Sequence, residues 1–240
     1  MNASLVKDYS NTTVSGYLAG FTTQVFGWMT VGVFLTGVVS FFVEYIFNSS
    51  LQLAALVTVL ALPAIIIQLV LVLVLSFLGR KLNGFVALTI FIFYSLFSGV
   101  TVGIITAGYQ VNSVFLAFGI SALIFFTLSI YGLVTKQDLT RIGTLFMFGL
   151  FGVILASIVN LFLFLFNSPL ADGLSMILSY IIVILFIAAI AYDAQRIKAY
   201  AAEAQSTGKT TSLAVSAALA LYLDFINIFL SILRITGKRR

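Results

Sequence analysis

Long apolar runs dominate this 240-residue chain and limit the folds that it can adopt. Hydrophobic residues make up 62% of the sequence and charged residues only 8%, whereas soluble domains carry roughly 25% charged residues. A helix needs about 20 apolar residues to cross a bilayer, and seven runs reach that length. The runs lack the roughly ten-residue alternation of barrel strands, and only helices or closed barrels satisfy the backbone in lipid. The sequence therefore predicts an all-α polytopic membrane protein, a bundle of seven transmembrane helices.

Short polar breaks separate the seven runs and set the expected domain organisation. The runs cover residues 21–46, 51–78, 85–107, 111–133, 143–166, 174–193 and 213–233. We expect a cytoplasmic N-terminal tail at residues 1–20, a transmembrane domain at 21–235 and a short basic C-terminal tail at 236–240. No room remains between the runs for a separate soluble domain.

The basic residues predict how the chain is oriented in the membrane. If every run spans, one side holds Lys7, Arg80, Lys81, Lys136, Arg141, Arg196, Lys198 and Lys209. The opposite loops hold only the acids Glu44 and Asp172. Cytoplasmic loops retain the excess of Lys and Arg, so the N-terminus is expected in the cytoplasm. Seven spans place the basic residues 238–240 on the side opposite the cytoplasm, against this rule. A re-entrant last segment, which would return them to the cytoplasm, is the alternative.

The sequence contains neither cysteine nor histidine, which excludes several kinds of chemistry. Disulfides, thiol nucleophiles and the usual zinc and haem sites all need one of these residues. No resident cofactor is therefore expected. A pH response near neutrality would have to come from carboxylates, because histidine is the usual switch. The net charge of +5 fits loops that face anionic lipid and does not indicate nucleic acid binding.

Two acids, Asp193 and Asp224, lie in or at the end of the last two apolar runs. A carboxylate at the bilayer centre costs about 2.5–3.5 kcal/mol, so such residues usually face a partner, a cavity or a pathway. Proton or cation handling is the leading hypothesis. A local ion pair between Asp193 and Arg196, three residues apart, is the simpler alternative. The two acids can meet only if part of 209–216 is a loop or if the sixth helix continues beyond the membrane, as the alanine-rich stretch 199–205 favours.

Small and polar residues form a stripe on the predicted seventh helix. They recur every three or four residues, at Ser216, Ala220, Asp224, Asn227, Ser231 and Arg234. Such a stripe is expected to face the bundle interior and line a cavity, although neutral members can equally serve helix–helix packing. Ser216, Asn227 and Ser231, with Gln68 and Asn160 in earlier runs, are the candidate pore-lining or supporting residues. In the third run, Gly99 and Gly103 have the spacing of a close helix contact.

Three segments of the sequence resemble a known family. Residues 191–197 (AYDAQRI) and 221–229 (LYLDFINIF) resemble the closing signatures of the Bax-inhibitor family, the transmembrane Bax inhibitor motif proteins. Residues 131–143 (YGLVTKQDLTRIG) resemble the loop after the fourth span in bacterial members. The resemblance extends from about residue 20 to 234.

The resemblance implies a bundle with the C-terminal helix at its centre, in a bacterial inner (cytoplasmic) membrane. It also implies a pH-sensitive cation leak with calcium as the permeating ion. In that scheme two aspartates share a proton across the sixth and seventh helices, and they match Asp193 and Asp224, which would also bind calcium transiently. A basic residue at the inner end of the second helix would lock the closed state. Arg80 and Lys81 both match that position, and Arg196 is a further basic candidate.

Two other functions remain open at the level of the sequence. Some bacterial relatives are viewed as regulators or partners of a membrane protease or of stress machinery, which would require a membrane-protein partner. An intramembrane aspartyl protease ranks lower. Tyr192 and Asp193 fit one of its motifs, but Leu221-Tyr222-Leu223-Asp224 departs from the Gly-x-Gly-Asp pattern of the other. We therefore expect a protein that is not an enzyme.

Overall fold

The computed structural model describes residues 3–240, with side chains from Gly16 onward. It consists of seven helices, and the described residues contain no strand. The helices are α1 (Ala3–Ser49), α2 (Leu51–Leu78), α3 (Gly84–Ala107), α4 (Val111–Val134), α5 (Thr140–Leu165), α6 (Leu170–Thr207) and α7 (Thr210–Thr236). All seven are long and apolar enough to cross a membrane, which confirms the predicted fold class.

Helix boundaries agree with the sequence-based prediction to within three residues except at α1 and α6. The predicted second run has the bounds of α2. Helix α1 begins at Ala3, so the described backbone of the expected N-terminal tail is helical. Helix α6 continues to Thr207 through the alanine-rich stretch. Alanine has the highest helix propensity, which explains why the helix persists where the apolar run has ended.

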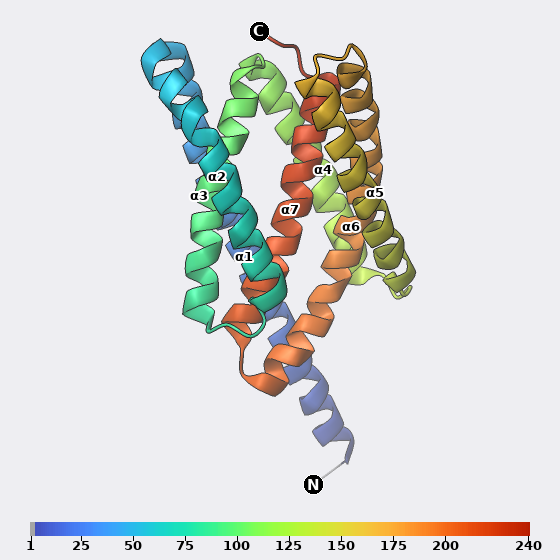
Figure 1. The fold of residues 1–240 in the computed structure, drawn as a ribbon. Helices are drawn as coiled ribbons and strands as arrows, with labels where there is room; N and C mark the ends of the chain where they lie inside the picture. The colour runs from blue at the N-terminus through green and yellow to red at the C-terminus, as the bar shows by residue number, and fades with distance from the viewer. Residues whose placement is uncertain (1–2) are drawn as a thin grey trace.

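Helix α7 lies at the centre of the bundle, as Figure 1 shows. It packs against α1, α3, α4 and α6, whereas α5 packs mainly on α6, and α2 mainly on α3. In its most apolar stretch, 67% of the α7 residues are buried, against 6% for both α2 and α5. The C-terminal helix is therefore the core element, and the outer helices present apolar side chains to the surroundings.

A tight turn joins α6 to α7. Gly208 has a positive φ of 70° and donates its N–H to the carbonyl of Ala204 at 2.9 Å. This left-handed conformation after a helix suits glycine, which has no Cβ to clash. Only Gly208 and Lys209 separate the two helices. The result is an antiparallel helical hairpin, and it fixes the relative heights of residues in α6 and α7.

Glycines permit the closest helix contacts, as the Gly99 and Gly103 spacing predicts. A Cβ added at Gly99 would lie 2.5 Å from the Cβ of Val39, and one at Gly103 would lie 2.7 Å from that of Val43. These contacts hold α3 against α1. The predicted packing role of the pair is confirmed.

The C-terminal segment lies at the opposite end of the bundle from the N-terminus (Figure 1). Gln110 donates its backbone N–H to Lys238 O at 2.9 Å, and Arg240 donates its own to Gly108 O at 3.1 Å. Residues 238–240 therefore sit on the α3–α4 connection. Helix α7 runs the length of the bundle, and the alternative of a re-entrant last segment does not fit.

Candidate functional site

Asp193 and Asp224 lie at the same height in neighbouring antiparallel helices. Asp193 stands 14 residues before Thr207, the end of α6, and Asp224 stands 14 residues after Thr210, the start of α7. At 1.5 Å per residue, each is about 21 Å from the turn. The extension of α6 beyond its apolar run produces this match, which is the second of the two conditions that the sequence left open.

Both carboxylates are withdrawn from the protein surface. Asp224 is 2% exposed, and its Oδ2 is buried with no hydrogen-bond partner among the described residues. The side chain of Asp193 is 11% exposed. Asp193 lies close enough to Asp224 across the α6–α7 interface for the two carboxyl groups to interact electrostatically. An unpaired carboxylate oxygen in such a place is costly, so the pair is a site that a proton or a cation would stabilise.

Arg196 forms an ion pair with Asp193, the α6 member of the aspartate pair. Its Nη1 donates to Asp193 Oδ1 at 3.2 Å, which is the local ion pair considered from the sequence. The guanidinium also lies over two rings, 5.4 Å from the centre of Tyr192 and 5.3 Å from that of Tyr200. Cation–π contacts of this kind hold an arginine in place when it is partly desolvated.

Arg80 is farther from the aspartates than Arg196 and contacts the extension of α6 instead. It forms an ion pair with Glu203 of α6, and its guanidinium is 5.4 Å from the centre of the Tyr200 ring. Glu203 is ten residues beyond Asp193, which corresponds to about 15 Å along α6. Tyr200 therefore contacts both arginines. Lys81, the other candidate, is exposed.

The polar candidates on α7 bond mainly within their own helix. Ser216 Oγ donates to Ser212 O at 2.9 Å, and Asn227 Nδ2 donates to Leu223 O at 2.7 Å. Ser231 is buried, at 6% exposed. These residues share the central helix with Asp224.

Gln68 and Asn160 instead join pairs of outer helices. Gln68 Oε1 accepts from Thr101 Oγ1 at 2.9 Å, between α2 and α3. Asn160 Nδ2 donates to Ser175 Oγ at 2.7 Å, between α5 and α6. These two side chains therefore bridge neighbouring helices. Neither bridge includes α7, and Ser175 lies 18 residues before Asp193, about 27 Å along α6.

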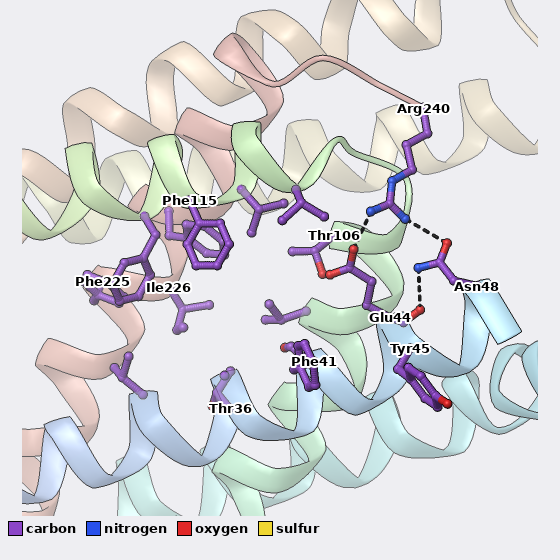
Figure 2. A pocket seen from close by; sticks show the side chains of 18 residues that line it. Thr36, Phe41, Glu44, Tyr45, Asn48, Thr106, Phe115, Phe225, Ile226 and Arg240 are labelled. Atoms are coloured by element: carbon purple, nitrogen blue, oxygen red, sulfur yellow. Dashed lines mark hydrogen bonds and ion pairs between the residues drawn. The ribbon is translucent and has the colours of Figure 1, made fainter.

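A cavity of about 500 Å³ lies elsewhere, between α1, α3, α4 and α7, and Figure 2 shows its lining. None of the candidate pore-lining residues borders it. It lies toward the C-terminal end of the bundle, where Arg240 and Glu44 border it. The aspartate pair and this cavity are therefore separate features.

Sequence reasoning missed a hydrogen-bonded set centred on Tyr222, two residues before Asp224. Thr36 Oγ1 donates to Ser95 O at 3.0 Å, so the Tyr222 hydroxyl, 2.7 Å away, donates to Thr36. Tyr222 is fully buried and packs edge-on against Phe91 and Tyr94. The only sign in the sequence was a tyrosine inside the 221–229 signature. Tyr200 and Glu203 were missed as well, because their partner Arg80 is remote in the sequence.

The described residues contain no group of three or more acidic side chains that could hold a metal ion together. Calcium takes six to eight oxygen ligands. Asp193 and Asp224 would supply part of such a set, with backbone carbonyls and water as the remainder.

The comparison with known proteins identifies the family. Residues 18–240 match the family described as "Inhibitor of apoptosis-promoting Bax1". The chain belongs to the Bax-inhibitor family. The resemblance seen in its closing signatures is thus confirmed over nearly the whole sequence.

Several bacterial relatives match along most of their length. The inner membrane protein YbhL of Escherichia coli K12 is 38% identical over 227 residues, which is 93% of each chain. An uncharacterized protein of Deinococcus radiodurans is 36% identical over 219 residues, 91% of this chain and 90% of the relative. An uncharacterized membrane protein of Streptococcus pyogenes serotype M1 is 39% identical over 222 residues, 91% and 92% of the two chains.

These findings establish a membrane protein of the Bax-inhibitor family. The two signature segments now have a structural meaning, because 191–197 and 221–229 are the parts of α6 and α7 that carry the aspartates at one height.

Proposed function

We propose that this Bax-inhibitor family member is a pH-sensitive cation leak channel with calcium as the permeating ion. Asp193 and Asp224 form its proton sensor and gate. The observation that supports this most directly is the equal height of the two carboxylates in adjacent helices, with Asp224 Oδ2 buried and unpaired.

Proton exchange at the pair would change the forces that hold α6 and α7 together. Close carboxylates titrate as a unit, because ionisation of one opposes ionisation of the other. Protonation of Asp193 would weaken its ion pair with Arg196 and release the inner end of the bundle. The deprotonated pair would attract a hard cation through its oxygen atoms.

The basic residues near the turn would stabilise the closed state in two steps. Arg196 holds Asp193 directly, and Arg80 ties the end of α2 to α6 through Glu203 and Tyr200. Arg80 is therefore our choice over Lys81 as the closed-state partner from α2, although it acts on the extension of α6 rather than on the aspartates.

The proposed orientation places the N-terminus in the cytoplasm of a bacterial cell, with the protein in the inner membrane. The extended end of α6 and the loop after α2 then face the cytoplasm with their basic residues. The aspartate pair would then sense cytoplasmic pH from within the bundle, about 21 Å from the α6–α7 turn.

Calcium flux into liposomes that contain the pure protein tests the proposal. We expect a pH-dependent leak in the wild type, and loss of the pH dependence in Asp193→Asn, Asp224→Asn and the double variant. Asp138→Asn is the matched control, since Asp138 is an exposed loop carboxylate that bonds to Thr140. The sensing role is wrong if both membrane-aspartate variants retain the wild-type pH profile.

The same preparation distinguishes the alternative of a regulatory protein. A stoichiometric membrane-protein partner, together with no ion permeability in pure vesicles, would favour a regulator of a membrane protease or of stress machinery. We propose no catalytic activity, and Asp224 in its Leu-Tyr-Leu-Asp context lacks the glycines of an aspartyl protease motif.

A further inference from the structure

The 500 Å³ cavity has lining residues on both α1 and α4, in the half of the bundle that holds the C-terminus, and Figure 2 shows its lining side chains. Both helices pack on α7 but scarcely contact each other. The floor is buried, with Val102 4% and Phe229 5% exposed, whereas Phe41 and Phe115 at the rim are 67% and 72% exposed. The hollow is thus continuous with the outer, membrane-facing surface of the bundle.

A second hollow extends the cavity along α1. This second hollow also has a volume of about 500 Å³. Its lining starts at Thr30 of α1 and includes Gly37 and Phe41, which also line the first cavity. Together they follow α1 from Thr30 to Asn48, about 27 Å. This is close to the thickness of a bilayer's hydrocarbon core, about 30 Å, so the groove suits a long, thin apolar ligand.

The hydroxyl groups in the wall already have partners. Thr36 donates to Ser95 O, Ser40 to Gly99 O at 3.0 Å, and Thr106 to Gly103 O at 3.2 Å. The groove therefore offers little to a hydrated ion or a polar solute. Apart from Glu44, Asn48 and Arg240 at one end, its remaining surface is mainly aliphatic and aromatic, which favours a hydrocarbon chain.

A basic segment is fixed at the end of the groove. Arg240 donates to Glu44 Oε1 at 2.6 Å and to Asn48 Oδ1 at 3.0 Å, and Lys238 N donates to Ser113 Oγ at 3.0 Å. Glu44 thus balances the charge of Arg240. Lys238 and Arg239 are exposed and form no ion pair within residues 16–240.

We propose that this groove binds one acyl chain of an anionic phospholipid, with the lipid phosphate held by Lys238 and Arg239. The chain would come from the membrane leaflet at the C-terminal end of the bundle. Clusters of lysine and arginine beside a transmembrane helix attract anionic headgroups. Such a site also accounts for three basic residues on the side of the membrane where the positive-inside rule disfavours them.

The lipid site is independent of the proposed leak function, since it requires neither flux nor proton binding. Its floor nevertheless includes Phe225, the residue after Asp224. A bound chain would therefore contact the turn of α7 that carries the buried aspartate.

Native mass spectrometry of the purified full-length protein tests the proposal with two probes. These are dioleoyl phosphatidylglycerol and dioleoyl phosphatidylcholine, which share acyl chains and differ in headgroup charge. Gly37→Phe fills the groove, since a Cβ at Gly37 meets nothing within 4 Å. Gly152→Phe on α5 is the matched control, because Gly152 also has open space but lies outside the groove.

We expect the wild type to retain one phosphatidylglycerol in preference to phosphatidylcholine. Gly37→Phe should retain it roughly tenfold more weakly, which corresponds to the loss of about two buried methylene groups. Gly152→Phe should behave as the wild type. Lys238→Ala with Arg239→Ala should abolish the preference for phosphatidylglycerol, and this double variant remains informative if Gly37→Phe fails to fold.

The proposal is overturned if Gly37→Phe keeps wild-type retention, or if Gly152→Phe loses lipid to the same degree. Equal binding of both lipids by the wild type, or occupancy by detergent alone, would also overturn it. None of these outcomes bears on calcium flux, so failure here leaves the proposed leak function untouched.

Discussion

Gly132 of α4 lies directly against the backbone of Ala191 in α6. A Cβ at Gly132 would come within 2.2 Å of the Ala191 carbonyl oxygen and 2.9 Å of the Ala194 Cβ. No side chain can adjust to relieve a clash with backbone, so α4 and α6 would have to separate. Because Ala191 and Ala194 flank Asp193, this contact also sets the position of the first aspartate.

Gly132→Ala should therefore destabilise the protein by about 1–3 kcal/mol, the usual cost of overpacking. Thermal unfolding in detergent measures this. Gly119→Ala in the same helix is the control, since its Cβ meets nothing within 4 Å. Alanine has the better helix propensity, so that variant should be neutral or slightly more stable. Equal stability of the two variants would contradict the close packing.

The α6–α7 turn provides a second prediction. Gly208→Ala places a Cβ in the left-handed conformation, which costs an L-residue roughly 1–2 kcal/mol. We expect a lower unfolding temperature than for Gly173→Ala, a change within α6 that meets no neighbour. A Gly208→Ala variant as stable as the wild type would show that the turn adopts another conformation.

The hydroxyl of Tyr222 provides a third prediction. Tyr222→Phe removes the hydrogen bond to Thr36 in a buried place, at a cost of about 1 kcal/mol. Thr36 still donates its hydroxyl hydrogen to Ser95 O, so the variant leaves no buried donor without an acceptor. Tyr180→Phe, at a tyrosine that is 53% exposed, is the matched change and should have little effect. Chemical unfolding of both variants in detergent makes the comparison.

The ion pair between Arg80 and Glu203 gives a prediction that depends on the proposed function. Glu203→Gln should increase calcium leak at neutral pH by freeing the end of α2 from α6. The effect on stability should be small, about 0–1 kcal/mol, because both side chains are partly exposed. Lys81→Gln removes a neighbouring charge outside the pair and serves as the control. The exchange of charges in Arg80→Glu with Glu203→Arg should restore the low leak.

The loop acid Asp138 makes a prediction about pH. Hydrogen bonds from the hydroxyl and the backbone N–H of Thr140 lower the pKa of Asp138 below its ordinary value. Because the folded-state pKa is lowered, the ionised carboxylate of Asp138 stabilises the folded protein. This stabilisation is complete above the unfolded pKa of about 3.9. It is lost as the pH falls through the lower folded value.

Asp138 should consequently stay ionised between pH 5 and 8, so it should add no pH dependence to stability or to flux in that range. Melting temperatures of Asp138→Asn and wild type, measured across that range, should differ by a constant amount. A difference that varies with pH in that window would assign part of the neutral-range response to the loop instead of the membrane aspartates.

Much of the fold could be read from residue order alone. The apolar runs predicted seven helices, and the run at 51–78 gave the bounds of α2. Asp193 and Asp224 stood out because charged groups are rare in such runs. These features are local, since the need to satisfy the backbone in lipid acts on each segment separately.

Three relationships depended on distant contacts. Arg80 could not be matched to Glu203 from the sequence, since 123 residues separate them. Tyr222 gave no sign that its hydroxyl reaches Thr36 on the first helix. The groove between α1 and α4 exists because both helices pack on α7 and leave space between them.

The sequence by itself determined the number of helices, the membrane environment and the presence of two acids within it, because hydrophobicity and helix propensity are properties of single segments. Only the tertiary structure decided that the acids share one height, that Arg196 pairs with Asp193 while Arg80 pairs with Glu203, and that Arg240 borders an apolar groove. Each of these depends on the register between packed helices, which the turn at Gly208 and the close contacts at Gly99, Gly103 and Gly132 fix in space.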